Sequence, residues 1–279
     1  MKLCRGVFLL FFVTATLLVT GCSKTPPSTP SPEQGSGRIT FAGSTTIQPL
    51  AGMIGDAFQK QHPNISLEIA AGGSKVGIQA VHDGTADIGM ASRALEAEEA
   101  EGIKQFKIAV DVIAVVVNSQ NPVENISREH LRQVYLGQIV NWKDLGGPDM
   151  EIVPVVREET SGTRGAFDEL VLEKEIPNAP KMVTAVTAGD VAAQVASNPG
   201  TLGYVGFGNI EDGLRAVAID GVEPSPATVE DESYGLVRPL LLLTGPLSQP
   251  LADVYIRFAL SDDGQAVVKE HGWIPANSD

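Results

Sequence analysis

The sequence of 279 residues has few of the residues that build metal sites and covalent cross-links. It contains 2 cysteines and 4 histidines, and the histidines (His62, His82, His130 and His271) lack the spacing of zinc ligands. Two cysteines cannot form a disulfide framework in a chain of this length. No metal site and no cofactor are therefore expected.

Basic residues are scarce as well. Lys and Arg number 20 against 34 Asp and Glu, which gives a net charge of −14. Such a chain has no broad positive surface, so nucleic acid is excluded as a partner. A hydrophobic content of 43%, with 29 Gly and 18 Pro, is typical of a folded protein with many turns, and the length predicts two medium domains or one large one.

The apolar run at residues 6–20 is too short to span a bilayer comfortably. It follows Lys2 and Arg5, which is typical of a signal peptide. The run ends in VTGC, which is similar to the lipobox of bacterial lipoproteins, where the cysteine is diacylated and becomes the new N-terminus. The alternative is an N-terminal helix followed by a chance Gly-Cys pair.

We therefore predict a signal peptide at residues 1–21 and lipidation at Cys22. Residues 22–36 are rich in Pro, Ser and Thr, a composition that cannot form a core and predicts a flexible linker. A lipid anchor would hold the protein to a membrane of the cell envelope, facing the periplasm or the extracellular side.

From residue 38 onward, β-prone runs alternate with apolar residues at helical spacing. Strands are predicted at residues 38–42, 67–71, 86–91, 151–156 and 202–207. Helices are predicted at residues 47–58, 76–82, 164–172, 190–196, 251–260 and 264–271. This alternation predicts an α/β fold with a largely parallel sheet, in which ligands bind at the carboxyl ends of the strands.

Two long apolar runs, residues 108–118 and 236–243, are interpreted as strands that cross between lobes. The predicted first lobe comprises residues 37–117 plus 236–279, and the second comprises residues 118–235.

Three polar turns lie between a predicted strand and a predicted helix: residues 43–46 (GSTT), 72–74 (GGS) and 160–163 (TSGT). Free backbone N–H groups at a helix start, joined by hydroxyls, can bind an anion without a lysine. Arg157 precedes the third turn and adds a guanidinium that can grip an oxyanion. The alternative for each turn is ordinary helix capping, which favours the same residue types.

Five segments carry a family resemblance: AGSTTIQPL (42–50), AAGGSKVGIQAV (70–81), ADIGMASRAL (86–95), REETSGTRGAF (157–167) and PGTLGYV (199–205). In order and spacing they resemble the periplasmic phosphate-binding protein of the high-affinity phosphate ABC transporter. The resemblance covers residues 37–279. It implies a two-lobed periplasmic-binding-protein fold of type II with two crossover strands, closing as a monomer on inorganic phosphate and delivering it to the permease subunits.

The resemblance also implies a set of phosphate-binding residues. They are Ser44, Thr45, Thr46, Ser74, Ser92, Arg93, Arg157, Ser161, Gly162 and Thr163. At Ser92 the family's usual pattern has an aspartate that accepts the proton of bound phosphate, so selectivity over sulfate or arsenate is left open. Glu158 and Asp190 are candidate replacement acceptors, with solvated surface acids as the alternative. Arg93 either contacts the ligand or pairs with Glu96 or Glu98.

Three other functions are weighed against phosphate import. The same fold can serve an anion sensor or a binder of sulfate, molybdate or tungstate. An enzyme would use Ser161 or Thr163 as nucleophile, but the sequence has no histidine in a base motif and no Gly-x-Ser-x-Gly elbow. We therefore expect no catalytic residues. A purely structural surface lipoprotein would bind no small molecule.

Overall fold

The computed structural model describes residues 36–276, which belong to one compact unit, Ser31–Asp279. The predicted signal peptide, the lipidation site Cys22 and the linker up to residue 35 lie outside the described residues. Those three predictions therefore stay predictions.

The first lobe is built on three parallel strands, β1 (Gly37–Gly43), β2 (Ile65–Ala71) and β3 (Ile88–Ala91). Helices α1 (Ile47–Gln61) and α2 (Ser74–His82) connect them, and α7 (Pro250–Ala259) and α8 (Asp262–Glu270) are added from the C-terminal segment. Helix α1 forms because its apolar residues recur every three or four positions, so that Leu50, Ile54 and Phe58 share one buried face. Burying each such side chain contributes about 1.5–3 kcal/mol.

The second lobe repeats the strand-turn-helix pattern. Strand β6 (Val153–Arg157) lies parallel to β7 (Val183–Ala185) and β8 (Thr201–Gly206). Helix α4 (Gly162–Leu170) follows β6, and α5 (Ala188–Ser197) follows β7. The short strand β7 was not predicted, and neither were several other short elements: β5 (Asn125–Ile126), α3 (Arg128–Tyr135), the 3-10 turns η2 (Trp142–Leu145) and η3 (Phe207–Asn209), β9 (Leu214–Ala216), β10 (Ala218–Ile219), α6 (Pro226–Glu230) and β12 (Ile274–Pro275).

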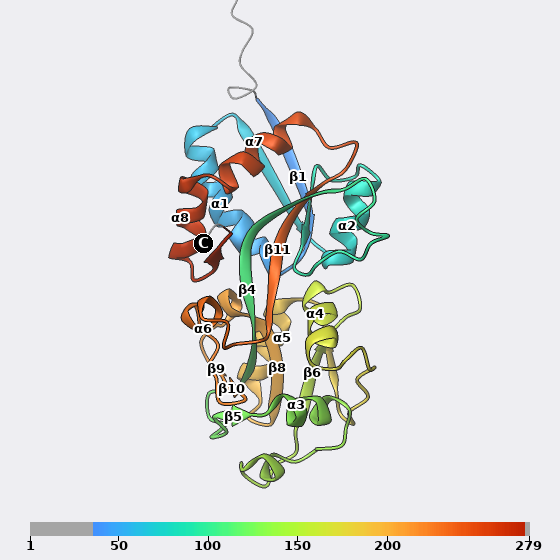
Figure 1. Cartoon of the computed structure of the whole chain (residues 1–279), viewed down its shortest axis with the longest axis vertical. Coiled ribbons are helices and arrows are strands. Elements are labelled where there is room, and N and C mark those ends of the chain that lie inside the picture. The colour runs from blue at the N-terminus through green and yellow to red at the C-terminus, as the bar shows by residue number, and fades with distance from the viewer. Residues whose placement is uncertain (1–35, 277–279) are drawn as a thin grey trace, which may run out of the picture. The chain divides into compact units, whose positions relative to one another are not determined.

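Two long strands, β4 (Lys104–Asn118) and β11 (Val237–Thr244), run between the two groups of elements (Figure 1). The strand order of the sheet is β2-β1-β3-β11-β4-β8-β6-β7. Strand β11 is antiparallel to β3 and β4, and β4 is antiparallel to β8. The expectation of a largely parallel sheet thus holds inside each lobe but not at the crossovers, because the two crossover strands run in opposite directions. The two-lobed α/β fold with two crossover strands is confirmed.

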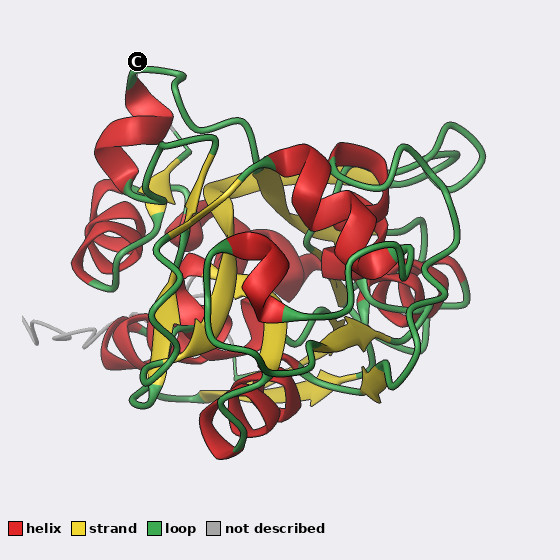
Figure 2. Cartoon of the chain, turned by 90° about the horizontal axis from the view of Figure 1, so that it is seen from below, coloured by secondary structure: helices red, strands yellow, loops and turns green. Residues whose placement is uncertain are grey.

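Each lobe has its own apolar core, and β4 contributes to both. Ile108 and Ala109 pack with the first-lobe core around Phe41 and Phe58. A few residues later, Val112 and Ile113 pack with the second-lobe core. Figure 2 shows the helices arranged around the strands. The numerical lobe boundaries of the sequence analysis stay a prediction. No helix among residues 36–276 is long and apolar enough to cross a bilayer.

Candidate anion-binding site

Polar residues gather where β1, β3 and β6 end and where α1, α2 and α4 begin. Ser44, Thr45 and Thr46 follow β1, Ser74 opens α2, Ser92 follows β3, and Ser161 to Thr163 follow β6. All of these hydroxyl side chains are buried, the most exposed being Thr45 at 8%. Because buried hydroxyls need hydrogen-bond partners, their contacts define how the site is arranged. We call these residues, without Gly162, the hydroxyl cluster.

The first-lobe hydroxyls form a chain of short contacts. The Ser44 hydroxyl donates to Ser92 Oγ at 2.9 Å and accepts from the backbone N–H of Thr46 at 3.2 Å. Ser74 Oγ accepts from the backbone N–H of Ser92 at 3.0 Å and lies 3.4 Å from Ser92 Oγ. Three turns that are distant in sequence thus meet at one place, as expected for the carboxyl ends of neighbouring parallel strands.

The second lobe contributes to the same cluster. Thr163 Oγ1 lies 3.1 Å from Thr46 Oγ1. Thr45 Oγ1 accepts from Arg157 Nη2 at 3.2 Å and from the backbone N–H of Ala188 at 3.3 Å. These contacts join residues more than a hundred positions apart, so the cluster bridges the lobes.

Gly162 marks the tightest approach between the lobes. A β-carbon at this position would overlap the Ser74 hydroxyl and would lie 2.8 Å from Ser92 Oγ. The backbone of α4 therefore reaches the first-lobe hydroxyls only because residue 162 has no side chain.

Arg157 is the last residue of β6 and is 1% exposed. Its guanidinium also donates to the carbonyl oxygens of Val186 at 2.7 Å and Ala185 at 3.3 Å, which fix it in place. Burial is the main cause that lowers the pKa of Arg157 below its ordinary value, and an arginine so placed still carries its charge at neutral pH. Arg157 thus brings a fixed positive charge to the neutral hydroxyls.

Helix capping, the alternative for the polar turns, applies to one of them. Ser161 is the N-cap of α4, and its hydroxyl accepts from the backbone N–H of Arg164. Thr46 is the N-cap of α1 without a side-chain capping bond, and α2 begins after Gly73, which has no side chain to cap with. The hydroxyls of Thr46 and Ser74 are therefore available to the cluster.

Arg93 lies beside the cluster rather than in its hydrogen-bond chain. Its guanidinium makes two bonds of 2.7 Å to the carboxylate of Glu99, and a third to the carbonyl of Ala94. The acid is Glu99 and not Glu96 or Glu98, the two partners that the sequence suggested. The Glu99 carboxylate also accepts from the backbone N–H of Glu96 at 3.0 Å, which holds it beside Arg93. A role for Arg93 in ligand binding stays a prediction.

The two candidate acceptors, Glu158 and Asp190, have other partners. Glu158 accepts from the Thr160 hydroxyl at 2.6 Å. Asp190 is exposed and accepts from the backbone N–H of Thr187 at 2.8 Å, as part of the capping box of α5. Among the hydrogen bonds described for residues 36–276, none joins a carboxylate oxygen to a hydroxyl of the cluster; Thr160, which bonds Glu158, precedes it.

A buried ion pair beside the cluster was missed by the sequence analysis. Arg238 on β11 donates from Nε and Nη2 to Asp111 Oδ2 on β4, at 2.9 and 2.7 Å, and both side chains are at most 1% exposed. Two features of the sequence indicate a buried ion pair. One acid interrupts the apolar run IAVDVIAVVVN and one arginine precedes the apolar run of residues 239–243, and charged residues are rarely buried unless paired.

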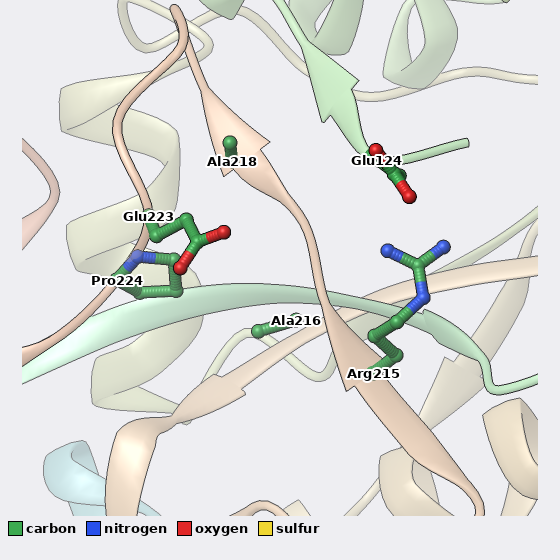
Figure 3. Close-up of a pocket in the computed structure, with 6 residues that line it drawn as sticks. All are labelled: Glu124, Arg215, Ala216, Ala218, Glu223 and Pro224. Atoms are coloured by element: carbon green, nitrogen blue, oxygen red, sulfur yellow. The ribbon is translucent and has the colours of Figure 1, made fainter. Parts of the chain in front are cut away.

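The pocket in Figure 3 is a different feature, and its chemistry does not suit an anion. It encloses about 400 Å³ between Glu124, Arg215, Ala216, Ala218, Glu223 and Pro224. Arg215 donates to the carbonyl oxygens of Asn121 and Val123, while two carboxylates line the pocket, so an anion there would meet net repulsion. In the part of the chain that the structure describes, no group of three His, Cys, Asp or Glu could hold a metal ion.

A two-lobed fold with buried hydrogen-bond donors at the junction of the lobes is typical of solute-binding proteins. Comparisons with known proteins place the chain in the same class. The family model described as the PBP superfamily domain matches residues 28–263. The phosphate-binding protein PstS of Bacillus subtilis is 30% identical, with 99% of this chain and 95% of that protein covered.

Solved structures give the same result. A putative phosphate ABC transporter substrate-binding protein with bound phosphate, from Clostridium perfringens, is 35% identical, with a TM-score of 0.82 over 86% of this chain and 100% of that chain. An ABC-type phosphate transport receptor from Vibrio cholerae is 32% identical, with a TM-score of 0.70 over 85% and 99%. The chain therefore belongs to the PBP superfamily and, within it, to the family of the phosphate-binding protein PstS.

Proposed function

We propose that the protein binds inorganic phosphate at the hydroxyl cluster and delivers it to the permease subunits of an ABC transporter for import. The observation that carries the proposal is the convergence of buried hydroxyls from both lobes with the guanidinium of Arg157, without a carboxylate among the bonded partners of Thr45, Thr46 or Ser92. Neutral dipoles and one fixed cation at short range can hold a small anion in an acidic protein. The relatives named for phosphate binding support it.

In this proposal each predicted ligand has a stated part. Ser44, Thr45, Thr46, Ser74, Ser92, Ser161 and Thr163 supply hydroxyl or backbone donors, Gly162 supplies backbone N–H, and Arg157 supplies charge. Arg93 acts from the edge of the site. Closure of the lobes desolvates the anion and strengthens each of these contacts.

Isothermal titration calorimetry on phosphate-stripped protein tests binding directly. We expect one phosphate site per chain, and a flat heat trace contradicts the proposal. Arg157→Ala should weaken phosphate binding by at least about thirtyfold, because a buried anion loses a countercharge. Arg132→Ala, on α3 and paired with Glu175 away from the hydroxyl cluster, is the matched control and should bind like wild type.

A binder of another oxyanion is the alternative that the fold also allows. Competition with sulfate, molybdate and tungstate distinguishes it, since phosphate should displace all three. We further propose that the protein binds phosphate without converting it. A chromogenic phosphate ester should show no turnover, because no described histidine or carboxylate is hydrogen-bonded to Ser161 or Thr163.

We also propose that the mature protein is a monomer anchored by a lipid on Cys22, outside the cytoplasm. The support is the order of charged start, apolar run and lipobox in residues 1–22. Metabolic labelling with palmitate in a bacterial host should label wild type, and Cys22→Ser should abolish the label.

A further inference from the structure

The ion pair of Arg238 and Asp111 lies between the crossover strands and the hydroxyl cluster. The two residues are directly opposite each other in the antiparallel register of β11 and β4. Asp111 Oδ1 accepts from the backbone N–H of Phe207 at 3.2 Å, just after β8 of the second lobe. The pair is thus held by both crossover strands and by one lobe.

The remaining donors of Arg238 are directed at the first-lobe part of the cluster. Nη2 donates to Thr46 Oγ1 at 3.3 Å. Nη1 donates to the carbonyl of Ser92 at 3.2 Å and lies 3.5 Å from Ser92 Oγ. Since Asp111 engages the guanidinium from the opposite side, Arg238 stands between the only fully buried carboxylate of the described residues and the hydroxyls.

These contacts determine where the hydroxyl protons point. A serine or threonine hydroxyl has one proton and two lone pairs. Ser92 Oγ accepts from Ser44 and from Arg238, so its own proton is directed to Ser74 Oγ. Ser74 Oγ also accepts from the Ser92 backbone N–H, which fills both of its lone pairs and leaves its proton free.

The same count applies to the threonines. Thr45 Oγ1 has both lone pairs filled by Arg157 and by the N–H of Ala188, so its proton is also free. Thr46 Oγ1 accepts from Arg238. The Thr46 and Thr163 hydroxyls have two protons, and the hydrogen bond between them uses one, so the other is free to donate. The cluster is consequently left with donors and with few open acceptors.

We propose that Arg238, held by Asp111, is a positioning residue that fixes the Thr46 and Ser92 hydroxyls in the donor orientation and so makes the site prefer the dianionic form of phosphate. This inference rests on the proposed function and deepens it. With both lone pairs of Ser92 occupied, the additional O–H of the monoanion loses Ser92 as an acceptor, and an unpaired buried donor is costly. Two guanidiniums, Arg157 and Arg238, contact the cluster through hydrogen bonds. Asp111 is paired with Arg238, and the carboxylates of Glu158 and Asp190 act on Arg157 without a hydrogen bond to a cluster hydroxyl.

The test is the pH dependence of phosphate affinity, with sulfate as the internal reference. Calorimetry is run at about pH 6 and about pH 8, a range in which phosphate groups lose their second proton and sulfate does not change. In wild type, phosphate affinity should rise with pH and sulfate affinity should stay constant. In Arg238→Lys, phosphate affinity at the higher pH should fall at least about thirtyfold.

The decisive readout is the slope with pH, because a merely structural role would not move it. Arg238 makes its bonds from three separate nitrogens, whereas a lysine offers one nitrogen, which we do not expect to reach Asp111, Thr46 and Ser92 together. The Ser92 hydroxyl of Arg238→Lys then regains an acceptor, and the rise of phosphate affinity with pH should shrink. Wild-type affinity in this variant, or lost affinity with the wild-type slope, would overturn the inference.

Two further samples keep the result unambiguous. The double variant D111N/R238Q removes both charges together and should show the same reduced slope, even if Arg238→Lys does not fold because Asp111 is poorly paired. Arg132→Lys is the matched control and should keep the wild-type affinity and slope. If wild type gives no heat with phosphate at either pH, the proposed function itself fails; a normal wild type with an unchanged slope in the variants rejects only the role of Arg238.

Discussion

At the scale of single residues, the site depends on the absence of a β-carbon at Gly162. The α4 backbone at Gly162 lies against Ser74 and Ser92, and even one methyl group would occupy space that Ser74 Oγ already fills. Gly162 is therefore needed for the close approach between the lobes. It is the first residue of α4, a position where alanine would otherwise be well tolerated.

Gly162→Ala should weaken phosphate binding by about tenfold, since overpacking of a tight contact costs about 1–3 kcal/mol. The melting temperature without ligand should change little, because the lobes can separate to relieve the overlap. Calorimetry and thermal unfolding measure the two effects. Gly52→Ala on α1, where a β-carbon meets nothing within 4 Å, is the control and should stabilise the fold by about 0.5–1 kcal/mol without changing affinity.

Some residues of the site can be predicted from the sequence and others cannot. Ser44 to Thr46, Ser74 and Ser161 to Thr163 were predicted because each set stands in a local pattern of strand, polar turn and helix. Arg238 and Asp111 are separated by 127 positions, and their pairing depends on the register of two crossover strands. A buried charge in an apolar run predicts that a partner exists, but not which residue it is.

At the scale of elements, the loop after β3 is closed by an ion pair. Arg93 and Glu99 are 11% and 24% exposed and meet through two hydrogen bonds. The Arg93 side chain also lies beside Gly165 of α4, where a β-carbon would be 3.0 Å from Arg93 Cδ. The hydrogen bonds from Arg93 lower the pKa of Glu99 below its usual 4.5.

A lowered pKa in the folded state has a definite sign for stability. The ion pair should stabilise the fold fully above pH 4.5, and this contribution should be lost as the pH falls through the folded-state pKa. Glu99→Gln should therefore lower the free energy of unfolding by about 1 kcal/mol at neutral pH, and this difference from wild type should disappear in acid. Urea unfolding across pH measures it. Glu98→Gln, at an exposed position, is the control and should unfold with the same free energy as wild type. A destabilisation by Glu99→Gln that grows in acid would contradict the role of the Arg93–Glu99 ion pair.

Elements with a clear local pattern were predicted well, and those formed by pairing were not. Strand β4 begins at Lys104, four residues before the predicted start at 108. Its first residues, KQFK, lack an apolar pattern and are strand only because they pair with Leu241 to Thr244 of β11. Strands β5 and β10, of two residues each, likewise exist only by pairing with each other.

At the scale of the whole molecule, the net charge of −14 repels the phosphate anion that we propose the site binds. Attraction begins only at the short range of the hydroxyls and guanidiniums, because long-range fields follow net charge. The association rate for phosphate should therefore rise as salt increases from about 0.01 M to about 0.15 M, where screening reaches about 8 Å.

Stopped-flow fluorescence of the buried Trp142 and Trp273 offers a direct way to follow this association. A rate that falls with salt would mean that a positive local field at the entrance steers the anion. Sodium chloride is the suitable salt, since sulfate would compete for the site.

The position of β11 between β3 and β4 also decides the order in which the chain can be completed during synthesis. The core of the second lobe comes mainly from one continuous stretch, residues 112–236, whereas the first-lobe sheet lacks a central strand until residues 237–244 have been made. The part of the protein that is translated first is thus finished last. Such an order would suit export before folding is complete, which the signal peptide predicted at residues 1–21 would require.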